Sequence, residues 1–90
     1  GMTILDSVSF SKDGEGTFIL YYSLDIDEEQ KNELVNNHLS ELRDMNLGIV
    51  KNSVQFNSMK EAGVTFLYKY NDLKTGKNVV ELKYEPKDYQ

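Results

Sequence analysis

Apolar and polar residues alternate in four segments of the chain, which is the pattern of half-buried β-strands. Residues 4–10 and 17–24 lie on either side of Asp13-Gly14, a dipeptide that favours the tight turn of a β-hairpin. Residues 64–70 and 80–85 alternate in the same way around a second glycine-containing turn. The sequence therefore predicts one hairpin near each end of the chain.

The first strand segment contains a break in its pattern. Ile4, Val8 and Phe10 share one parity, but Asp6 falls among them on the apolar side. A charged side chain on the core-facing side is typical of an edge strand. We therefore expect this part of the chain to lie at an edge of the sheet.

Between the hairpins, apolar residues recur at spacings of three and four, which is the period of an α-helix. Asp27 and Gln30 form a capping-box pattern at the start of this helix, and Gly48 is expected to end it. A helix of about twenty residues is roughly 30 Å long, enough to cross a small sheet. The apolar stripe contains Leu34, Val35, His38, Leu39, Leu42 and Met45.

Residues 49–62 fit two different structures. Alternation through Phe56 slightly favours a strand followed by a helical turn. Alternatively, Ser53 caps a short helix in which Phe56 and Met59 face inward and Gly63 ends it. The pattern of residue types leaves both interpretations open.

These elements predict an α+β fold with the element order ββα(α/β)ββ. The expected architecture is an antiparallel sheet of four strands, or five if residues 49–62 are extended, with one long helix on one face. Residues 1–85 would form a single domain and residues 86–90 a polar tail, while Gly1 before Met2 suggests a remnant of tag cleavage. The expected core contains Phe10, Phe18, Leu20, Tyr22, Leu34, Leu39, Leu42, Phe66, Tyr68, Val80 and Leu82.

Composition narrows the classes of function. The 90 residues carry a net charge of −5, which argues against nucleic acid as a partner because duplex binding needs a basic surface. Residues 1–48 hold ten acidic and three basic side chains, whereas residues 49–90 hold five and seven. There is no cysteine, which excludes disulfides and thiolate chemistry. No apolar run approaches the roughly 20 residues of a transmembrane helix.

The sequence offers no set of residues with a recognisable catalytic spacing. His38 is the single histidine, and we expect it to have a structural role, since catalysis would need a nucleophile or carboxylate beside it. The acidic residues from Asp25 to Glu29 lack the spacing of a calcium loop, and helix capping accounts for them. We therefore expect no enzymatic activity, no cofactor and no metal.

The outer face of the predicted sheet is less polar than a solvated face should be. Four apolar side chains point away from the inferred core and would form one patch if their strands are neighbours: Ile19, Tyr21, Leu67 and Val79. Such a patch is typical of a protein partner surface or a dimer interface, unless residues 49–62 cover it. We therefore predict a non-catalytic interaction or structural domain that associates through this face or an edge strand, with a small ligand-binding protein or enzyme as an alternative.

Several segments of the chain resemble a set of small uncharacterised bacterial proteins. The similar segments are Leu5-Asp-Ser-Val8, the strand Thr17–Leu24 with paired tyrosines, the acidic helix, and Gly63-Val-Thr-Phe-Leu-Tyr-Lys-Tyr70 followed by Asp72 and Gly76. Many of those proteins are exported or lipid-anchored, so the resemblance implies an accessory domain of the cell envelope as a further alternative. It also favours a short helix at residues 53–62, and it implies no activity.

The compartment depends on where the native chain begins. If Met2 is the native start, we expect a cytoplasmic protein, because no signal sequence follows it. If a signal was trimmed away, the resemblance implies the cell envelope or secretion. Many of the similar proteins hold a cysteine pair that this chain lacks, which argues against an oxidising compartment.

Overall fold

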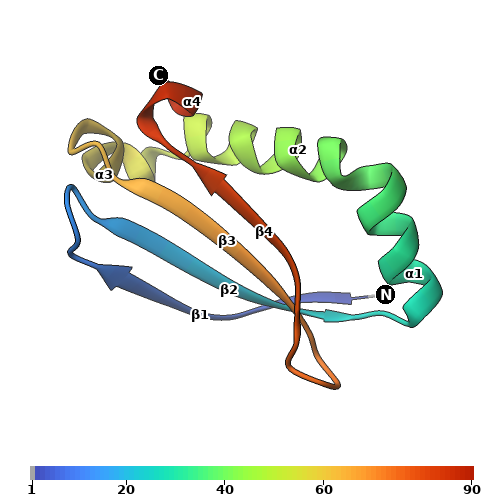
Figure 1. Ribbon diagram of the computed structural model, residues 1–90. Coiled ribbons are helices and arrows are strands. Elements are labelled where there is room, and N and C mark those ends of the chain that lie inside the picture. The colour runs from blue at the N-terminus through green and yellow to red at the C-terminus, as the bar shows by residue number, and fades with distance from the viewer. Residues whose placement is uncertain (1) are drawn as a thin grey trace.

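Four strands form one sheet in the order β1-β2-β3-β4 in the computed structural model, which describes residues 2–90 (Figure 1). The strands are β1 (Met2–Ser11), β2 (Thr17–Asp25), β3 (Thr65–Asp72) and β4 (Asn78–Tyr84). Both predicted hairpins are present, because β1 pairs with β2 and β3 pairs with β4 in antiparallel register. The α+β class is thus confirmed, with four strands rather than five.

The prediction of an antiparallel sheet is wrong at its centre, where β2 and β3 run parallel. Phe18 lies opposite Phe66, and Leu20 lies opposite Tyr68. Parallel neighbours need a long crossover connection, and the helical segment between β2 and β3 provides it by returning along one face of the sheet (Figure 1). The two hairpins therefore join side by side into a mixed sheet.

The crossover begins with a nearly continuous helix made of α1 (Glu28–Glu33), a π-helical turn η1 (Leu34–His38) and α2 (Leu39–Asn52). The predicted capping box is present: the Gln30 backbone N–H donates to the Asp27 carboxylate over 2.8 Å, and the Asp27 backbone N–H donates to the Gln30 side-chain oxygen over 2.9 Å. The helix does not end at Gly48 as predicted. It continues to bury Val50 completely, which offsets the roughly 1 kcal/mol that glycine costs inside a helix.

The π-helical turn alters the predicted apolar stripe. Leu34 and Leu39, five residues apart, both pack against the core, whereas Val35 and His38 between them are exposed. A π turn adds one residue to the helical period, so it brings two leucines onto the same face. The helix axis bends between α1 and α2 in Figure 1, as expected at such a turn.

The ambiguous residues 49–62 are helical. After α2 ends, a 3-10 turn η2 (Val54–Phe56) leads into α3 (Asn57–Glu61). Phe56 and Met59 pack against the core, and Gly63 ends the segment with a φ of 78°. The short helix is confirmed and the strand is wrong, since Phe56 packs against Phe66 at a ring-centroid distance of 5.2 Å. Ser53 precedes the 3-10 turn, but its side chain makes no capping hydrogen bond.

Residues 86–90 were expected to form a polar tail, but they contribute to the core. They contain the helix α4 (Pro86–Tyr89), whose Tyr89 is buried and stacks edge-on against Phe66. The Tyr89 hydroxyl donates to the Val64 carbonyl over 2.7 Å. This expectation is therefore wrong: the last turn of the chain is part of the domain.

The core lies between the helix and the inner face of β2, β3 and β4. Five of the predicted core residues are buried and five lie at its margin, but Phe10 on β1 is 48% exposed, so its assignment to the core is wrong. Desolvation by burial raises the pKa of Tyr68 and Tyr70, and raises that of Tyr84 to about 12. The buried apolar residues are Leu20, Leu24, Val50, Val64, Phe66, Tyr68, Tyr70, Val80, Leu82, Tyr84 and Tyr89.

We predict that Val50→Ala lowers the free energy of unfolding by about 2 kcal/mol, because it removes two fully buried methyl groups and leaves a cavity. Val54→Ala is the matched control, since Val54 is 78% exposed, and it should change stability by less than about 0.5 kcal/mol. Urea denaturation followed by circular dichroism measures both. Equal effects of the two substitutions would contradict the extension of α2 past Gly48.

Candidate functional site

Specific hydrogen bonds fix the position of the helix over the sheet. The Tyr84 hydroxyl on β4 donates to the Arg43 carbonyl over 2.9 Å, and the Arg43 guanidinium donates to the Lys83 carbonyl over 3.2 Å. The Asn46 amide donates to the Tyr70 hydroxyl on β3 over 2.8 Å. These partners of α2 all belong to β3 or β4, so the helix lies over that half of the sheet.

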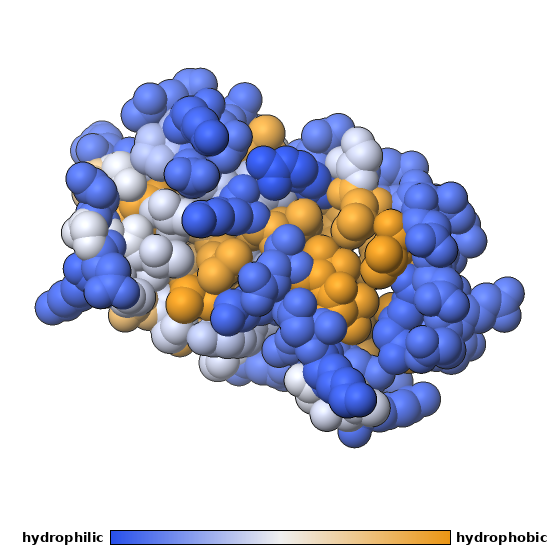
Figure 2. All heavy atoms as spheres, viewed as in Figure 1, coloured by the Kyte–Doolittle hydropathy of each residue, from blue (hydrophilic) through white to orange (hydrophobic). Residues whose placement is uncertain are grey.

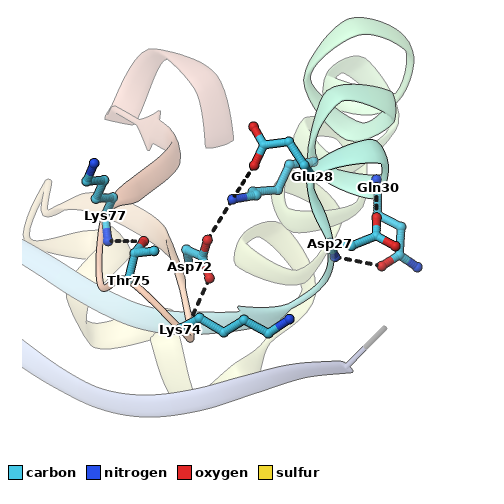
Figure 3. Close-up of polar contacts among 8 residues, drawn as sticks. Asp27, Glu28, Gln30, Asp72, Lys74, Thr75 and Lys77 are labelled. Atoms are coloured by element: carbon cyan, nitrogen blue, oxygen red, sulfur yellow. Dashed lines mark hydrogen bonds and ion pairs between the residues drawn. The ribbon is translucent and has the colours of Figure 1, made fainter.

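A partly buried ion pair holds the first turn of the helix at the same half (Figure 3). The Lys31 ammonium lies 2.6 Å from the Asp72 carboxylate and 3.0 Å from that of Glu28. Asp72 also accepts a hydrogen bond from the Lys74 amide over 2.8 Å. The hydrogen bond from Lys31 lowers the pKa of Asp72, and the same bond raises the pKa of Lys31. The pair therefore ties α1 to the turn between β3 and β4.

A surface hollow of about 420 Å³ lies beside this ion pair. Its lining combines the charged groups of Lys31, Asp72 and Lys77 with the apolar side chains of Val35 and Val79. Figure 2 shows apolar atoms gathered between β4 and the helix and framed by hydrophilic atoms. Because Lys31 and Asp72 pair with each other, their charges stabilise the position of α1 and do not point to a bound ligand.

The other half of the sheet is bare. Every side chain from Thr3 to Phe10 on β1 is exposed. Leu5, Val8 and Phe10 keep 51%, 50% and 48% of their surface in contact with solvent. They lie opposite inward-facing residues of β2, so they point to the face that carries the helix, and the helix does not reach them. These three side chains and the free edge of β1 form what we call the β1 surface.

A β-bulge at Asp6 determines which side chains belong to the β1 surface. Leu5 pairs with Tyr22 and Ser7 pairs with Tyr21, so Asp6 is the extra residue. A bulge inverts the alternation beyond it. Leu5, rather than Ile4 as the alternation predicted, therefore shares a face with Val8. The Asp6 carboxylate accepts a hydrogen bond from the Ser23 hydroxyl.

An apolar groove of about 240 Å³ runs between the start of β1 and the helix. Its lining comes from the first two strands, the helix and β3: Thr3, Leu24, Ile26, Leu34, Leu42 and Tyr70. The groove is on the same face of the sheet as the β1 surface, since Thr3 lies opposite the buried Leu24. The exposed apolar area thus extends from the strand towards the helix.

Three of the four residues of the predicted partner surface share one face of the sheet, and the fourth does not. Ile19, Tyr21 and Leu67 lie on the outer face, with Ile19 directly opposite Leu67, and all three are partly buried. The Lys69 ammonium lies 5.9 Å from the centroid of the Tyr21 ring. Val79 sits at an irregularity of β4 and packs against the core, so its expected outward direction is wrong. A role of the other three in binding stays a prediction.

Residues 1–80 match the family model described as "Domain of unknown function (DUF8479)". The chain belongs to the DUF8479 family. This agrees with the resemblance to uncharacterised proteins, while the specific strand motif stays untested. No match to the chain was found among curated proteins.

The DUF8479 chain is similar in structure to a crystal structure from Pseudomonas aeruginosa, of a protein that is thought to be secreted. The TM-score is 0.73 at 14% sequence identity, and the match covers 90% of this chain and 68% of that one. At this level of identity the similarity shows a shared fold and nothing more. Within residues 2–90, no helix is long and apolar enough to cross a membrane.

His38 lies on the surface of the DUF8479 domain, at the end of the π-helical turn. Its ring nitrogens are 3.3 Å from the Glu33 carboxylate and 3.4 Å from that of Glu41. A hollow of about 460 Å³ beside it is lined mainly by acidic and polar residues of α1. In the described part of the chain, no group of three histidine or acidic side chains is arranged to hold a metal ion.

We predict that Asp72→Asn lowers the melting temperature at pH 7, because it removes the charge that pairs with Lys31. A carboxylate with a lowered pKa stabilises the fold above its unfolded pKa of about 3.9, and this contribution is lost as the pH falls through the folded value. The difference between wild type and variant should therefore shrink below about pH 4.

Thermal unfolding at pH 7 and pH 3 tests this expectation. Asp44→Asn is the control, because Asp44 is exposed on α2 and its loss should produce no such narrowing. A difference between wild type and Asp72→Asn that is equally large at both pH values would contradict the assigned role of the ion pair.

Proposed function

We propose that this DUF8479 chain is a non-catalytic interaction domain that binds another polypeptide through the β1 surface. The observation that supports this best is the exposure of a whole strand, with Leu5, Val8 and Phe10 each about half accessible to solvent. Exposed apolar area next to a free strand edge is typical of a protein-binding site. An added strand would pair with the edge and cover these side chains.

The two edges of the sheet differ in a way that supports this assignment. The β4 strand has seven residues, and two of them, Glu81 and Lys83, carry exposed charges. The Arg43 guanidinium also donates a hydrogen bond to the Lys83 carbonyl. Charged side chains and covered carbonyls protect an edge against unwanted pairing. The β1 edge has ten residues and a single charged side chain, Asp6. Only the β4 edge is thus protected in this manner.

The apolar side chains of the β1 surface supply enough energy for modest binding. Burying the exposed halves of Leu5, Val8 and Phe10 contributes roughly 2–4 kcal/mol. Backbone hydrogen bonds along the edge add to this, while the loss of translational and rotational freedom opposes it. We therefore expect reversible association rather than a permanent complex.

The non-catalytic part of the proposal is supported by the polar groups of the hollows. Lys31 and Asp72 are paired inside one hollow, and His38 in the other has carboxylate neighbours but no hydroxyl nucleophile among the lining residues. Acid–base or nucleophilic catalysis needs converging groups held away from water. Glu33 and Glu41 are largely exposed instead.

A second candidate function is an exported accessory domain of the cell envelope. It is supported by the structural similarity to a Pseudomonas aeruginosa protein that is thought to be secreted and by the resemblance to exported proteins. Fractionation of the native cells decides between the compartments. Recovery of the protein only in the cytoplasm would contradict this candidate, and it would leave the interaction proposal intact.

We predict that a photoreactive phenylalanine analogue at position 8 forms covalent adducts with polypeptides. The purified protein is irradiated alone and in an extract of the native cells, and adducts are separated by mass. The same analogue at position 41 is the control, because Glu41 is exposed on α2 away from the β1 surface. Absence of adducts at position 8 above the control in both samples would contradict the proposed function.

A further inference from the structure

We propose that the polypeptide bound at the β1 surface is a second copy of the same chain. The two β1 strands would pair antiparallel around a two-fold axis that passes through Ser9. This inference rests on the proposed function and specifies its partner. Three features of the domain support it: the free edge of β1, the match of side chains across the axis, and the opposite charges of Asp6 and Lys12.

Symmetry favours pairing of β1 with β1. A contact between β1 of one copy and β4 of the next would be head-to-tail and could continue into a filament. The charges of Glu81 and Lys83 and the contact of Arg43 with the Lys83 carbonyl protect β4 against such a contact. Pairing of β1 with its own copy uses the same surface twice and closes at a dimer.

The sequence of β1 is self-complementary around Ser9. A two-fold axis perpendicular to the sheet pairs residues at equal distances on either side of the axis, and it keeps each side chain on its own face. Val8 then lies opposite Phe10, and Ser7 lies opposite Ser11. Just beyond these pairs, at each end of the interface, the bulge residue Asp6 of one copy comes near the Lys12 side chain of the other. Apolar, polar and oppositely charged residues each meet a suitable partner.

Neighbouring axes do not give this match. An axis through Val8 would place the bulge at Asp6 opposite Phe10, which leaves Phe10 without an apolar partner. An axis through Phe10 would place Val8 opposite Lys12, which sets an ammonium group against an apolar side chain. Of these three axes, the one through Ser9 is the one that pairs Val8 with Phe10 on the apolar face and brings opposite charges together at the ends.

The side chains involved are available in the monomer. Val8 and Phe10 are each about half exposed, and Lys12 is exposed in the turn after β1. One oxygen of the Asp6 carboxylate accepts a hydrogen bond from the Ser23 hydroxyl. The other oxygen can therefore accept a hydrogen bond from the Lys12 ammonium group of the second copy. In the dimer, Val8 and Phe10 of both copies form one apolar cluster on the face that carries the helices.

The bulge at Asp6 limits the length of the interface. Regular pairing extends over residues 7–11, a length of about 17 Å, because the bulge interrupts the strand at one end and the turn begins at the other. An interface of this size belongs to the small, transient class. We therefore expect a dimer that forms and dissociates with concentration.

The first test is disulfide trapping, for which the chain is well suited because it has no cysteine. Ser9→Cys places two thiols next to the two-fold axis, within reach of a disulfide. Under mild oxidation it should form a covalent dimer at protein concentrations where Ser58→Cys, an exposed position on α3, stays monomeric. Equal trapping at both positions would overturn the proposed axis.

The second test is charge reversal with rescue, measured by sedimentation equilibrium. Each dimer holds the Asp6–Lys12 pair twice, so Lys12→Asp should raise the dissociation constant roughly tenfold. The double variant Asp6→Lys, Lys12→Asp restores opposite charges and should return to within about threefold of wild type. Circular dichroism verifies that each variant is folded. A dissociation constant that Lys12→Asp leaves unchanged would overturn the proposed register.

The outcomes separate this inference from the proposed function. A protein that stays monomeric up to about millimolar concentration, and gives no self-adduct from position 8 when irradiated alone, would overturn the homodimer. If adducts with other polypeptides then form in the extract, the interaction domain stands with a different partner. If no adducts form in either sample, both proposals fail together.

Discussion

A single helix cannot cover a four-stranded sheet, and this limit determines which strand of the domain stays exposed. A helix is about 10 Å wide with its side chains, whereas four strands span roughly 14 Å between the outer strand axes, with side chains beyond them. The side chains of Arg43, Asn46 and Lys31 fix the helix over β3 and β4. The strand farthest from that half, β1, is therefore the one left bare.

The same helix has to connect two parallel strands, which explains why the crossover is long and why it is irregular. The chain must travel back along the sheet from the end of β2 to the start of β3 (Figure 1). The π-helical turn keeps Leu34 and Leu39 on the core side during this path. The short helices α3 and α4 then close the end of the core, where Phe56 and Tyr89 pack on Phe66.

Periodicity in the sequence predicted the elements that repeat without interruption. The two hairpins, the capping box at Asp27 and most inward positions of the last two strands follow from unbroken alternation. Errors in the direction of side chains lie where one extra residue changes the phase, at Asp6 in β1, near Val79 in β4 and in the π turn. Tyr89 follows no period, since it is one aromatic residue after a proline, and its burial depends on distant residues such as Val64.

The candidate site was harder to predict because it depends on lateral position. Alternation shows which side chains share a face, and it placed Ile19, Tyr21 and Leu67 on the outer one. It does not show which strands the helix covers, since that depends on contacts between residues some forty positions apart, such as Arg43 with Lys83. The antiparallel assumption failed for a related reason: local patterns carry no information about how two distant hairpins join.

An exposed apolar strand is a risk of aggregation, and the rest of the domain limits that risk. The net charge of −5 opposes non-specific contacts between copies at close approach, because repulsion between like charges acts within about 8 Å at physiological salt. The bulge at Asp6 shortens the stretch that can pair, and the charges on β4 block growth at the other edge. Because the stretch of β1 that can pair is short, and β1 has one charged residue and is the edge left unprotected, it permits one contact of defined register without extension into a fibre. Pairing at the bare strand therefore stops at two copies only because the other edge is protected.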